Sequence, residues 1–497
     1  MGGGAFEGGA SRRPSPPLST SFSLGVKPPT DVSNIVLYLC AGGDDWETGL
    51  LAQARGEEEG GAGDAAAAAS TSAADAALAA RGRAIFEAIT SSGPLSAKEG
   101  EMAHTALARL AARAGDARGA LAATRAALAA GLPPRNRAFF PAMLAHCASG
   151  DAAAAFAVDG EAAAAGLAAG ERDCELLLGA AARAPPGGAS LWASIETVLY
   201  RFTREHGRLQ AATLDAAARA FASPAAAAAL APGGPLHDAS LPPRAWSVAR
   251  VSVDPGTGAV AGLPGASANA SLAPVDLDPE EWDALAAGVA TLARSRERRP
   301  SDFDDFVAWL SKRGPFGAVV DGANVALFGQ NWERGGFDFG QLRDALSALE
   351  RARPGARPLV ILHRSRLAGP AARSPPGRDL LADLKARQCL YAAPHGSNDD
   401  WYWLHATVAA KAGGLLVSND EMRDHAFALL APALVGRWKE RHRATYTFNG
   451  RGAELEMPPP FSACAQRVAG GAWLLPPEGD SEAWLAAVPA PVPTEDA

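Results

Sequence analysis

An internal repeat of 35 residues constrains the fold of the first half of the chain more than any other feature. The dipeptide Gly-Asp occurs at 115–116 and again at 150–151, and Gly-Leu occurs at 131–132 and again at 166–167. In each unit, Gly-Asp separates two alanine-rich helical stretches and Gly-Leu ends the second. Helix pairs of this kind bury their apolar faces by stacking on their neighbours. The sequence therefore predicts an α-helical solenoid over residues 76–235.

Composition agrees with a multidomain chain rather than one large globule. Hydrophobic residues make up 48% of the 497, and many of them are alanine, which buries little surface. Residues 1–75 are rich in glycine, serine and proline and include the acidic stretch GEEEGGAGD, so we expect most of this segment to be disordered. The net charge of −8 argues against binding nucleic acid by bulk attraction, and RNA binding would need local basic patches.

After residue 300 the pattern changes to alternating strands and helices. The expected strands are the one that ends at Asp321, then RPLVILHR, CLYAAP, LLVSN and, as the last strand, ATYTF. This order predicts a parallel sheet with helices on both faces, in an α/β domain over residues 301–457. Residues 236–300 and 458–490 are expected to form a small β-containing connector, because PPRAWSVARVSV alternates like a strand.

Four carboxylates follow the predicted strands. Asp321 ends the run AVVD, Asp399 and Asp400 lie in GSNDDWYW, and Asp420 follows LLVSN. Because parallel strands end at the same edge of a sheet, we expect these side chains to lie together. Mg²⁺ prefers such oxygen ligands, and a bound metal offsets the repulsion between neighbouring carboxylates. The sequence therefore predicts that the four aspartates are catalytic and hold Mg²⁺, with Asp424 as a candidate further ligand.

Helix capping is the alternative role for these acids. Ser397 with Asp400, and Ser418 with Glu421, have the spacing of a capping box, and acids in a first turn also favour the helix dipole. A cap does not need the additional carboxylate of Asp399, and three predicted strand ends converge on one edge. We therefore favour the metal site.

Several polar and basic residues are candidates for RNA contact. They are Asn324, Arg423 and His425 near the aspartates, and Arg437, Lys439 and Arg441 in the run RWKERHR. Ordinary salt bridges on a solvated helix face are an open alternative for the basic run.

Cysteine usage and hydropathy bear on the compartment. The five cysteines have no CxxC pair or short spacing, which argues against a disulfide framework and a thiolate zinc site and favours a reducing compartment. No apolar run approaches the roughly 18 residues of a membrane span, and no secretory signal is evident. Arg12, Arg13 and several serines partly fit a transit peptide, so a soluble, intracellular chain in the nucleus, a mitochondrion or a chloroplast is expected, with the choice open.

Five stretches resemble the protein-only RNase P family, in which pentatricopeptide repeats are joined to an NYN/PIN-like metallonuclease domain. They are VVDGANVALFGQN, GSNDDWYWLHA, LLVSNDEMRDHAF, RWKERHRATYTF and VDLDPEE, and the similarity covers residues 76–490. The resemblance implies removal of the 5′ leader from precursor tRNA, with two Mg²⁺ ions, or Mn²⁺ as a substitute, at the four aspartates. It further implies RNA binding by the repeats, a monomer, no RNA subunit and no membrane partner.

One departure from the resemblance concerns metal in the connector. The family holds a structural zinc with a CxxC shortly before the VDLDP-like segment and with a His and a Cys near the C-terminus. The corresponding positions here are Gly265, Ala268, Leu474 and Ala486. We therefore predict that structural zinc is absent and that packing around Trp473, Leu474, Leu475 and Trp484 replaces it.

Three other functions fit parts of the pattern. A 35-residue period is close to the ~34 residues of tetratricopeptide repeats, which would suit a protein-binding array. A PIN-type endonuclease acting on other structured RNA would use the same carboxylates. A non-catalytic pentatricopeptide RNA-binding protein would not need them, and their presence argues against it.

Overall fold

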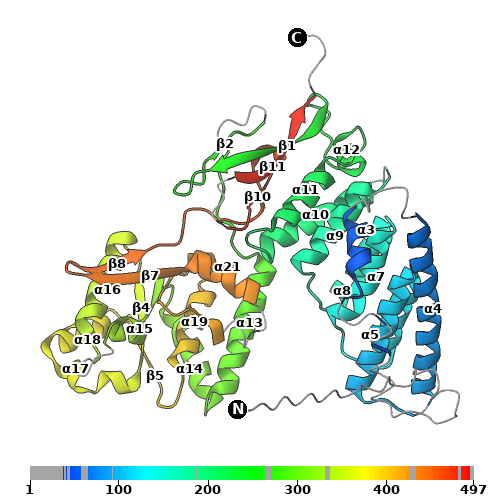
Figure 1. The fold of residues 1–497 in the computed structure, drawn as a ribbon. Helices are drawn as coiled ribbons and strands as arrows, with labels where there is room; N and C mark the ends of the chain where they lie inside the picture. The colour runs from blue at the N-terminus through cyan, green and yellow to red at the C-terminus, as the bar shows by residue number, and fades with distance from the viewer. Residues whose placement is uncertain are drawn as a thin grey trace, which may run out of the picture. The chain divides into compact units, whose positions relative to one another are not determined.

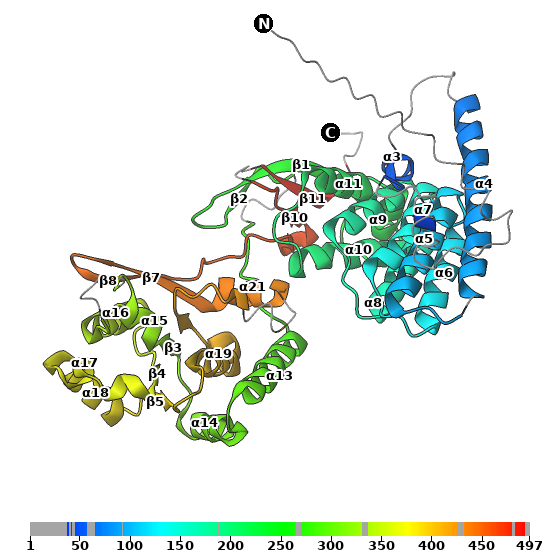
Figure 2. The same cartoon turned by 60° about the horizontal axis from the view of Figure 1, so that its bottom comes forward.

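The computed structural model describes residues 37–38, 41, 45–56, 65–91, 93–185, 189–264, 270–330, 336–424, 429, 432–479 and 483–492. The chain forms two compact units, each described below by itself. The first comprises Met1–Ile195 and Asp215–Ala239, and the second comprises Glu196–Leu214 and Ser240–Ala497 (Figures 1 and 2). None of the described helices is long and apolar enough to cross a membrane.

The first unit is helical, as the repeat predicts. Its successive helices are α3 (Thr48–Arg55), α4 (Ala65–Thr90), α5 (Ala97–Arg113), α6 (Ala117–Ala129), α7 (Asn136–Ala148), α8 (Ala152–Ala164), α9 (Glu171–Arg183), α10 (Ala189–Arg204), which continues into the second unit, α11 (Ala211–Phe221), which begins in the second unit, and α12 (Pro224–Leu230). Neighbouring helices pack in pairs, α5 on α6 and α7 on α8. Within residues 1–75, which the sequence predicts to be mostly disordered, the structure describes α3, which packs against α7 and α9, and the start of α4, where the run 65–69 consists of alanine, the best helix former.

The repeated dipeptides form the turns between these helices. Gly115 and Gly150 have φ angles of +73° and +77°, a conformation that favours glycine. Asp116 and Asp151 then cap the next helix, each accepting a hydrogen bond from the backbone N–H three residues on. Each 35-residue repeat in the sequence therefore corresponds to one pair of helices.

An antiparallel sheet joins two distant parts of the second unit. Its strand order is β2-β1-β11-β10-β9, built from β1 (Arg244–Val253), β2 (Val260–Ala261), β9 (Gln466–Arg467), β10 (Trp473–Leu475) and β11 (Ala483–Pro491). β1 pairs with β11 from Arg244 opposite Pro491 to Ser252 opposite Ala483. Segments from the predicted connector thus lie side by side in one sheet.

A second sheet of six strands forms the nuclease-like part. Its order is β5-β4-β3-β6-β7-β8, with β3 (Ala318–Asp321), β4 (Pro358–His363), β5 (Leu390–Ala393), β6 (Leu416–Val417), β7 (Arg443–Asn449) and β8 (Gly452–Glu456). The first five are parallel, as predicted. The expectation that ATYTF is the last strand is wrong, because β8 returns antiparallel to β7 through a tight turn in which Gly452 has φ +113°.

Helices cover both faces of this sheet, as predicted. One face packs on α13 (Pro279–Arg296), α14 (Pro300–Arg313), α19 (Asp399–Ala409) and α21 (Pro432–His442), and the other on α16 (Phe339–Ala352) and α18 (Pro375–Ala386) (Figure 2). Alternate strand residues serve the two cores: Val319 faces the first and Val320 the second. The predicted boundary at residue 301 cuts off α13, whose Trp282 and Val289 lie in the first core, so the nuclease fold begins with that helix.

Candidate active site

The four predicted catalytic aspartates all follow strands at the carboxyl edge of the parallel sheet. Asp321 is the last residue of β3 and precedes α15 (Gly322–Leu327). Asp399 and Asp400 are the first two residues of α19, beyond β5, and Asp420 lies in the loop after β6. α19 packs against β3, the strand that ends at Asp321.

Asp321 lies at the base of this edge. It is only 4% exposed, and its carboxylate accepts hydrogen bonds from Ser418 Oγ at 3.0 Å and from the backbone N–H of Asn324 at 3.0 Å. Burial, with smaller contributions from the charges of Asp400 and Asp399, raises its pKa to about 7 against the lowering effect of these hydrogen bonds. This buried carboxylate is therefore within electrostatic reach of the α19 pair.

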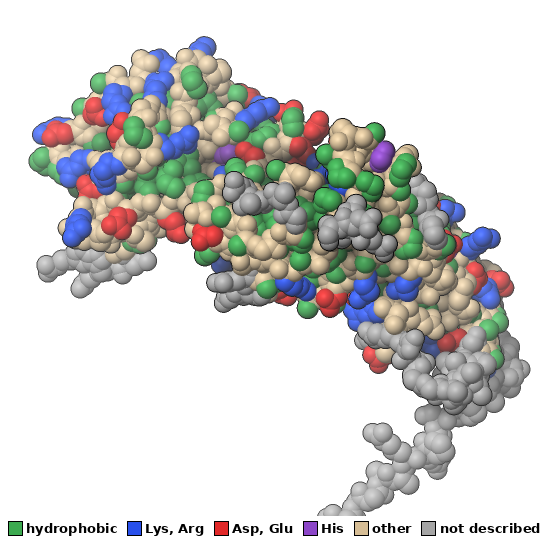
Figure 3. Space-filling model, turned by 90° about the horizontal axis from the view of Figure 1, so that it is seen from above, with side chains coloured by type: hydrophobic (Ala, Val, Ile, Leu, Met, Phe, Trp, Pro, Cys, Tyr) green, Lys and Arg blue, Asp and Glu red, His purple; other side chains and the backbone are tan. Residues whose placement is uncertain are grey.

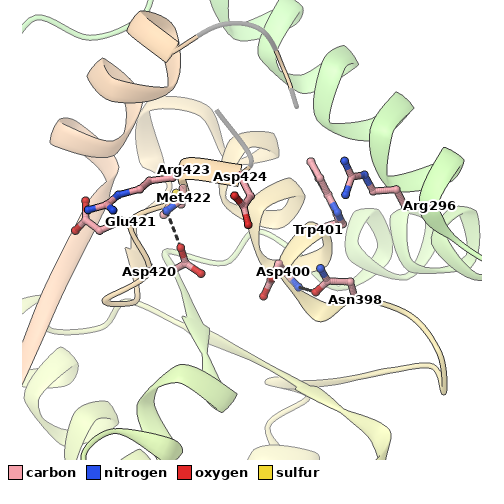
Figure 4. A pocket seen from close by; sticks show the side chains of 9 residues that line it. All are labelled: Arg296, Asn398, Asp400, Trp401, Asp420, Glu421, Met422, Arg423 and Asp424. Carbon is pink, nitrogen blue, oxygen red and sulfur yellow. Dashed lines mark hydrogen bonds between the residues drawn. The ribbon is translucent and has the colours of Figure 1, made fainter. Parts of the chain in front are cut away.

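A cavity of about 560 Å³ opens beside these residues. It is lined by Arg296, Asn398, Asp400, Trp401, Asp420, Glu421, Met422, Arg423 and Asp424. Figure 4 shows the carboxylates of Asp400, Asp420 and Asp424 facing one another across this pocket. We refer to it as the carboxylate pocket.

The two capping boxes that the sequence offers as an alternative to the metal site, Ser397 with Asp400 and Ser418 with Glu421, do not form. The N-cap of α19 is Asn398, whose side chain accepts from the backbone N–H of Asp400 at 3.0 Å. Ser397 Oγ instead donates to Glu297 at 2.6 Å. Ser418 Oγ donates to Asp321 and accepts from the N–H of Asp420 at 3.1 Å, so this serine links two of the predicted ligands.

A tight turn orients Asp420. Its carboxylate accepts from the backbone N–H of Met422 at 2.6 Å, and Met422 has φ +54°, in the left-handed region that non-glycine residues seldom adopt. Met422 is 1% exposed, and its packing in the core holds this conformation. Arg443 donates to the carbonyl oxygen of Asp420 at 2.7 Å. Strained turns of this kind cluster at functional sites.

The donor set fits a hard divalent cation. The pocket offers carboxylate and amide oxygens, and no histidine or cysteine is among the lining residues of the described chain. Within the described residues, no three His, Cys, Asp or Glu side chains lie close enough together to hold an ion. The fit therefore rests on ligand chemistry, and metal binding would draw mutually repelling carboxylates closer.

Comparisons with known proteins agree with this geometry. A family described as protein-only RNase P matches residues 265–489, and the pentacotripeptide-repeat region of the same family matches residues 64–228. Proteinaceous RNase P 2 of Arabidopsis thaliana is 33% identical over 440 residues, which cover 82% of this chain and 79% of the relative. This chain belongs to the protein-only RNase P family.

Other members of the protein-only RNase P family are also similar. Proteinaceous RNase P 3 of Arabidopsis thaliana is 33% identical over 80% of this chain and 70% of that protein. Proteinaceous RNase P 1, chloroplastic/mitochondrial, is 44% identical over 204 residues, only 34% of its length. The crystal structure of nuclear proteinaceous RNase P 2 from A. thaliana superimposes with a TM-score of 0.72 at 28% identity, covering 95% of this chain and 94% of that one. The predicted combination of repeats and nuclease-like domain is confirmed.

The predicted RNA-contact residues of this protein-only RNase P occupy different places. Arg423 lines the carboxylate pocket, and His425 lies outside the described residues. The side-chain oxygen of Asn324 accepts from the backbone N–H of Asn419 at 2.9 Å and from the Tyr446 hydroxyl. Asn324 thus ties α15 to the loop after β6 and to β7, a structural role that the sequence did not reveal.

The basic run of this family member is largely engaged within the fold. Arg437 is mostly buried and pairs with Glu281, Lys439 Nζ lies 2.7 Å from Glu421, and Arg441 donates to a backbone carbonyl. On the face drawn in Figure 3, acidic and basic side chains are likewise interspersed. Salt bridges thus engage Arg437 and Lys439 in the free protein, and contact of the basic run with RNA stays a prediction.

The positions at which the protein-only RNase P family carries zinc ligands are apolar where they are described. Leu474 and Ala486 are cross-strand partners in β10 and β11, and both are fully buried. Trp484 packs in the same core. Gly265 and Ala268 lie outside the described residues. Leu474 and Ala486 offer no donor atom, so these two positions do not fit a zinc ion.

Proposed function

We propose that this chain is a Mg²⁺-dependent endoribonuclease that removes the 5′ leader from precursor tRNA. The carboxylate pocket, at the carboxyl edge of the sheet of a protein-only RNase P family member, carries the proposal. Hydrolysis would break the bond from the scissile phosphorus to the leader's 3′ oxygen. Water would add to the phosphorus, leaving a 5′-phosphate on the tRNA and a 3′-hydroxyl on the leader.

Asp321, Asp399, Asp400 and Asp420 are the proposed ligands, with Asp424 as a further one. Two Mg²⁺ ions, for which Mn²⁺ could substitute, would supply Lewis-acid stabilisation of the charge that develops on the phosphodiester. The chain itself positions the ligands. Ser418 fixes the carboxylate of Asp321, the Met422 N–H fixes that of Asp420, and the positive N-terminal end of α19 offsets part of the charge on its first two residues.

The repeats are the proposed contact for the body of the precursor tRNA. A cavity of about 270 Å³ in the first unit is lined by Trp46, Arg109, Phe140 and Arg172, among others. The Arg109 guanidinium lies 5.4 Å from the Trp46 ring centre, and that of Arg172 lies 5.0 Å from the ring centre of Phe140. Trp46 is buried, whereas the arginine side chain of Arg172 is exposed, and arginine faces stack on exposed bases. A monomer without an RNA subunit would then suffice.

Cleavage of a radiolabelled precursor tRNA tests this function. In Mg²⁺ we expect one cut, at the junction of leader and mature tRNA, and no cut when EDTA is added. A structured RNA hairpin of equal length with a 5′ extension serves as the control substrate. Equal cleavage of both RNAs would favour a general PIN-type endonuclease, and binding without cleavage would favour a non-catalytic RNA-binding protein.

We also propose that the antiparallel sheet folds without structural zinc. Its core contains Leu474, Ala486 and Trp484, so burial of apolar surface supplies the stability that a metal site would otherwise provide. Purified protein is expected to contain far less than one zinc per chain by elemental analysis, and EDTA is expected to leave its melting temperature unchanged in Mg²⁺-free buffer. One tightly held zinc per chain would contradict this proposal.

A further inference from the structure

Arg296 lies at the rim of the carboxylate pocket without an assigned role. It is the last residue of α13, its side chain is exposed, and it lines the pocket. Its guanidinium lies 5.3 Å from the ring centre of Trp401, close enough for a cation–π contact. Figure 4 shows the two side chains together at one side of the pocket.

The local structure fixes this arginine with respect to the pocket. Trp401 is 3% exposed and belongs to the same core as α13, and α13 packs against α19. Glu297, the residue after Arg296, accepts a hydrogen bond from Ser397 just before α19. The end of one helix is therefore held at the start of the other, which carries Asp399 and Asp400.

Arg296 differs from its basic neighbours in its partners. Arg294 pairs with Asp304 at 2.8 Å, and Arg299 pairs with Asp302 at 3.2 Å. Among the described residues, no ion pair is recorded for Arg296, although the pocket beside it holds four acids. A guanidinium that lies over a ring face still has N–H donors pointing outward in its own plane, where they can bind an anion.

We propose that Arg296 binds a phosphate of the precursor tRNA backbone next to the scissile phosphodiester. The inference rests on the proposed function, since it takes the pocket to be the place where RNA is cut. The carboxylates repel a polyanion as it approaches, and a cation at the rim offsets that repulsion. The planar donor fork of arginine suits a phosphate better than the point charge of lysine.

Loss of this contact should weaken substrate binding. For Arg296→Ala we expect about a tenfold rise in the KM for precursor tRNA, with a smaller change in kcat. The slope of log affinity against log salt concentration should become shallower by about 0.7 to 0.9, the contribution of one phosphate contact. Arg296→Lys should recover part of the loss. Arg299→Ala is the matched control, because it removes a nearby exposed charge that Asp302 already neutralises, and it should change KM less than twofold.

Neutral methylphosphonate linkages locate the phosphate. A series of substrates carries one such linkage each, at successive positions flanking the cleavage site. At one of these positions the linkage should weaken binding by wild-type protein and should not weaken binding by Arg296→Ala any further. If the losses in binding caused by the linkage and by Arg296→Ala are additive at every position, the proposal is overturned. Should the alanine variant fail to fold, the same comparison is made with Arg296→Lys. If wild-type protein does not cleave precursor tRNA, the proposed function fails first. If wild-type protein cleaves precursor tRNA and Arg296→Ala has the same KM as the wild type, only the arginine contact is overturned.

Discussion

Replacing both Asp399 and Asp400 by asparagine is expected to lower the rate of precursor tRNA cleavage by about a thousandfold or more. The two residues open α19 beside the buried carboxylate of Asp321. Asparagine keeps the size of each side chain and removes the negative charge that a hard cation requires. Single-turnover cleavage in saturating Mg²⁺ measures the loss, and the expected deficit persists at high Mg²⁺ concentration.

A matched substitution separates this effect from a general loss of charge. Asp383 on α18 is exposed and pairs with Arg387, so Asp383→Asn should leave cleavage within twofold of wild type. Binding of precursor tRNA by the double variant should change much less than its cleavage rate. Near-normal cleavage by the double variant would remove these residues from the site.

Replacing Asp321 by asparagine should abolish cleavage and yet stabilise the metal-free protein at neutral pH. Burial raises the pKa of Asp321 from its ordinary 3.8 to about 7, so its ionised form is disfavoured in the fold. This rise in pKa means that ionising Asp321 lowers the free energy of unfolding by roughly 4 kcal/mol. Asparagine is uncharged at all these pH values and does not incur the loss.

The sign of the pH dependence follows from the raised pKa of Asp321. The folded state binds this proton more tightly than the unfolded chain does, so the stabilisation is complete below pH 3.8 and is lost as the pH rises to about 7. The melting temperature of wild-type protein in EDTA should therefore fall across this range relative to that of Asp321→Asn. Chemical denaturation at several pH values gives the same comparison as free energies.

Magnesium provides the control for the Asp321 prediction. A cation that binds only the folded state raises its stability, so Mg²⁺ should raise the melting temperature of the wild type and leave Asp321→Asn nearly unchanged. Equal Mg²⁺ effects on both proteins would place the bound ion away from this residue. An asparagine variant less stable than the wild type in EDTA at pH 7.5 would contradict the account of the buried carboxylate.

Local patterns in the sequence were sufficient for the repeats and for the acidic edge of the sheet. Gly-Asp marks a left-handed turn followed by a helix cap, and both requirements act within a few residues. Likewise, Asp321 ends a short apolar run that has to be a buried strand in an alternating α/β order. Such features depend on neighbours in the chain and can be inferred from it.

Contacts between distant residues could not be inferred in this way. Arg437 pairs with Glu281, 156 residues earlier, and this pairing decides whether its charge is free. Arg296 meets Trp401 only because α13 belongs to the nuclease core rather than to the connector. Ser418 matches a capping pattern, but its hydroxyl donates to Asp321, 97 residues earlier. Tertiary packing, not local preference, determined these partners.

The most direct test of the central claim is to locate the metal. Crystals soaked in Mn²⁺, at a concentration that supports cleavage, should show anomalous density in the carboxylate pocket, bounded by Asp400 and Asp420. The density should disappear in the variant that combines Asp399→Asn and Asp400→Asn. Anomalous density confined to another part of the protein, or an empty pocket under conditions in which the enzyme cleaves precursor tRNA, would contradict the account.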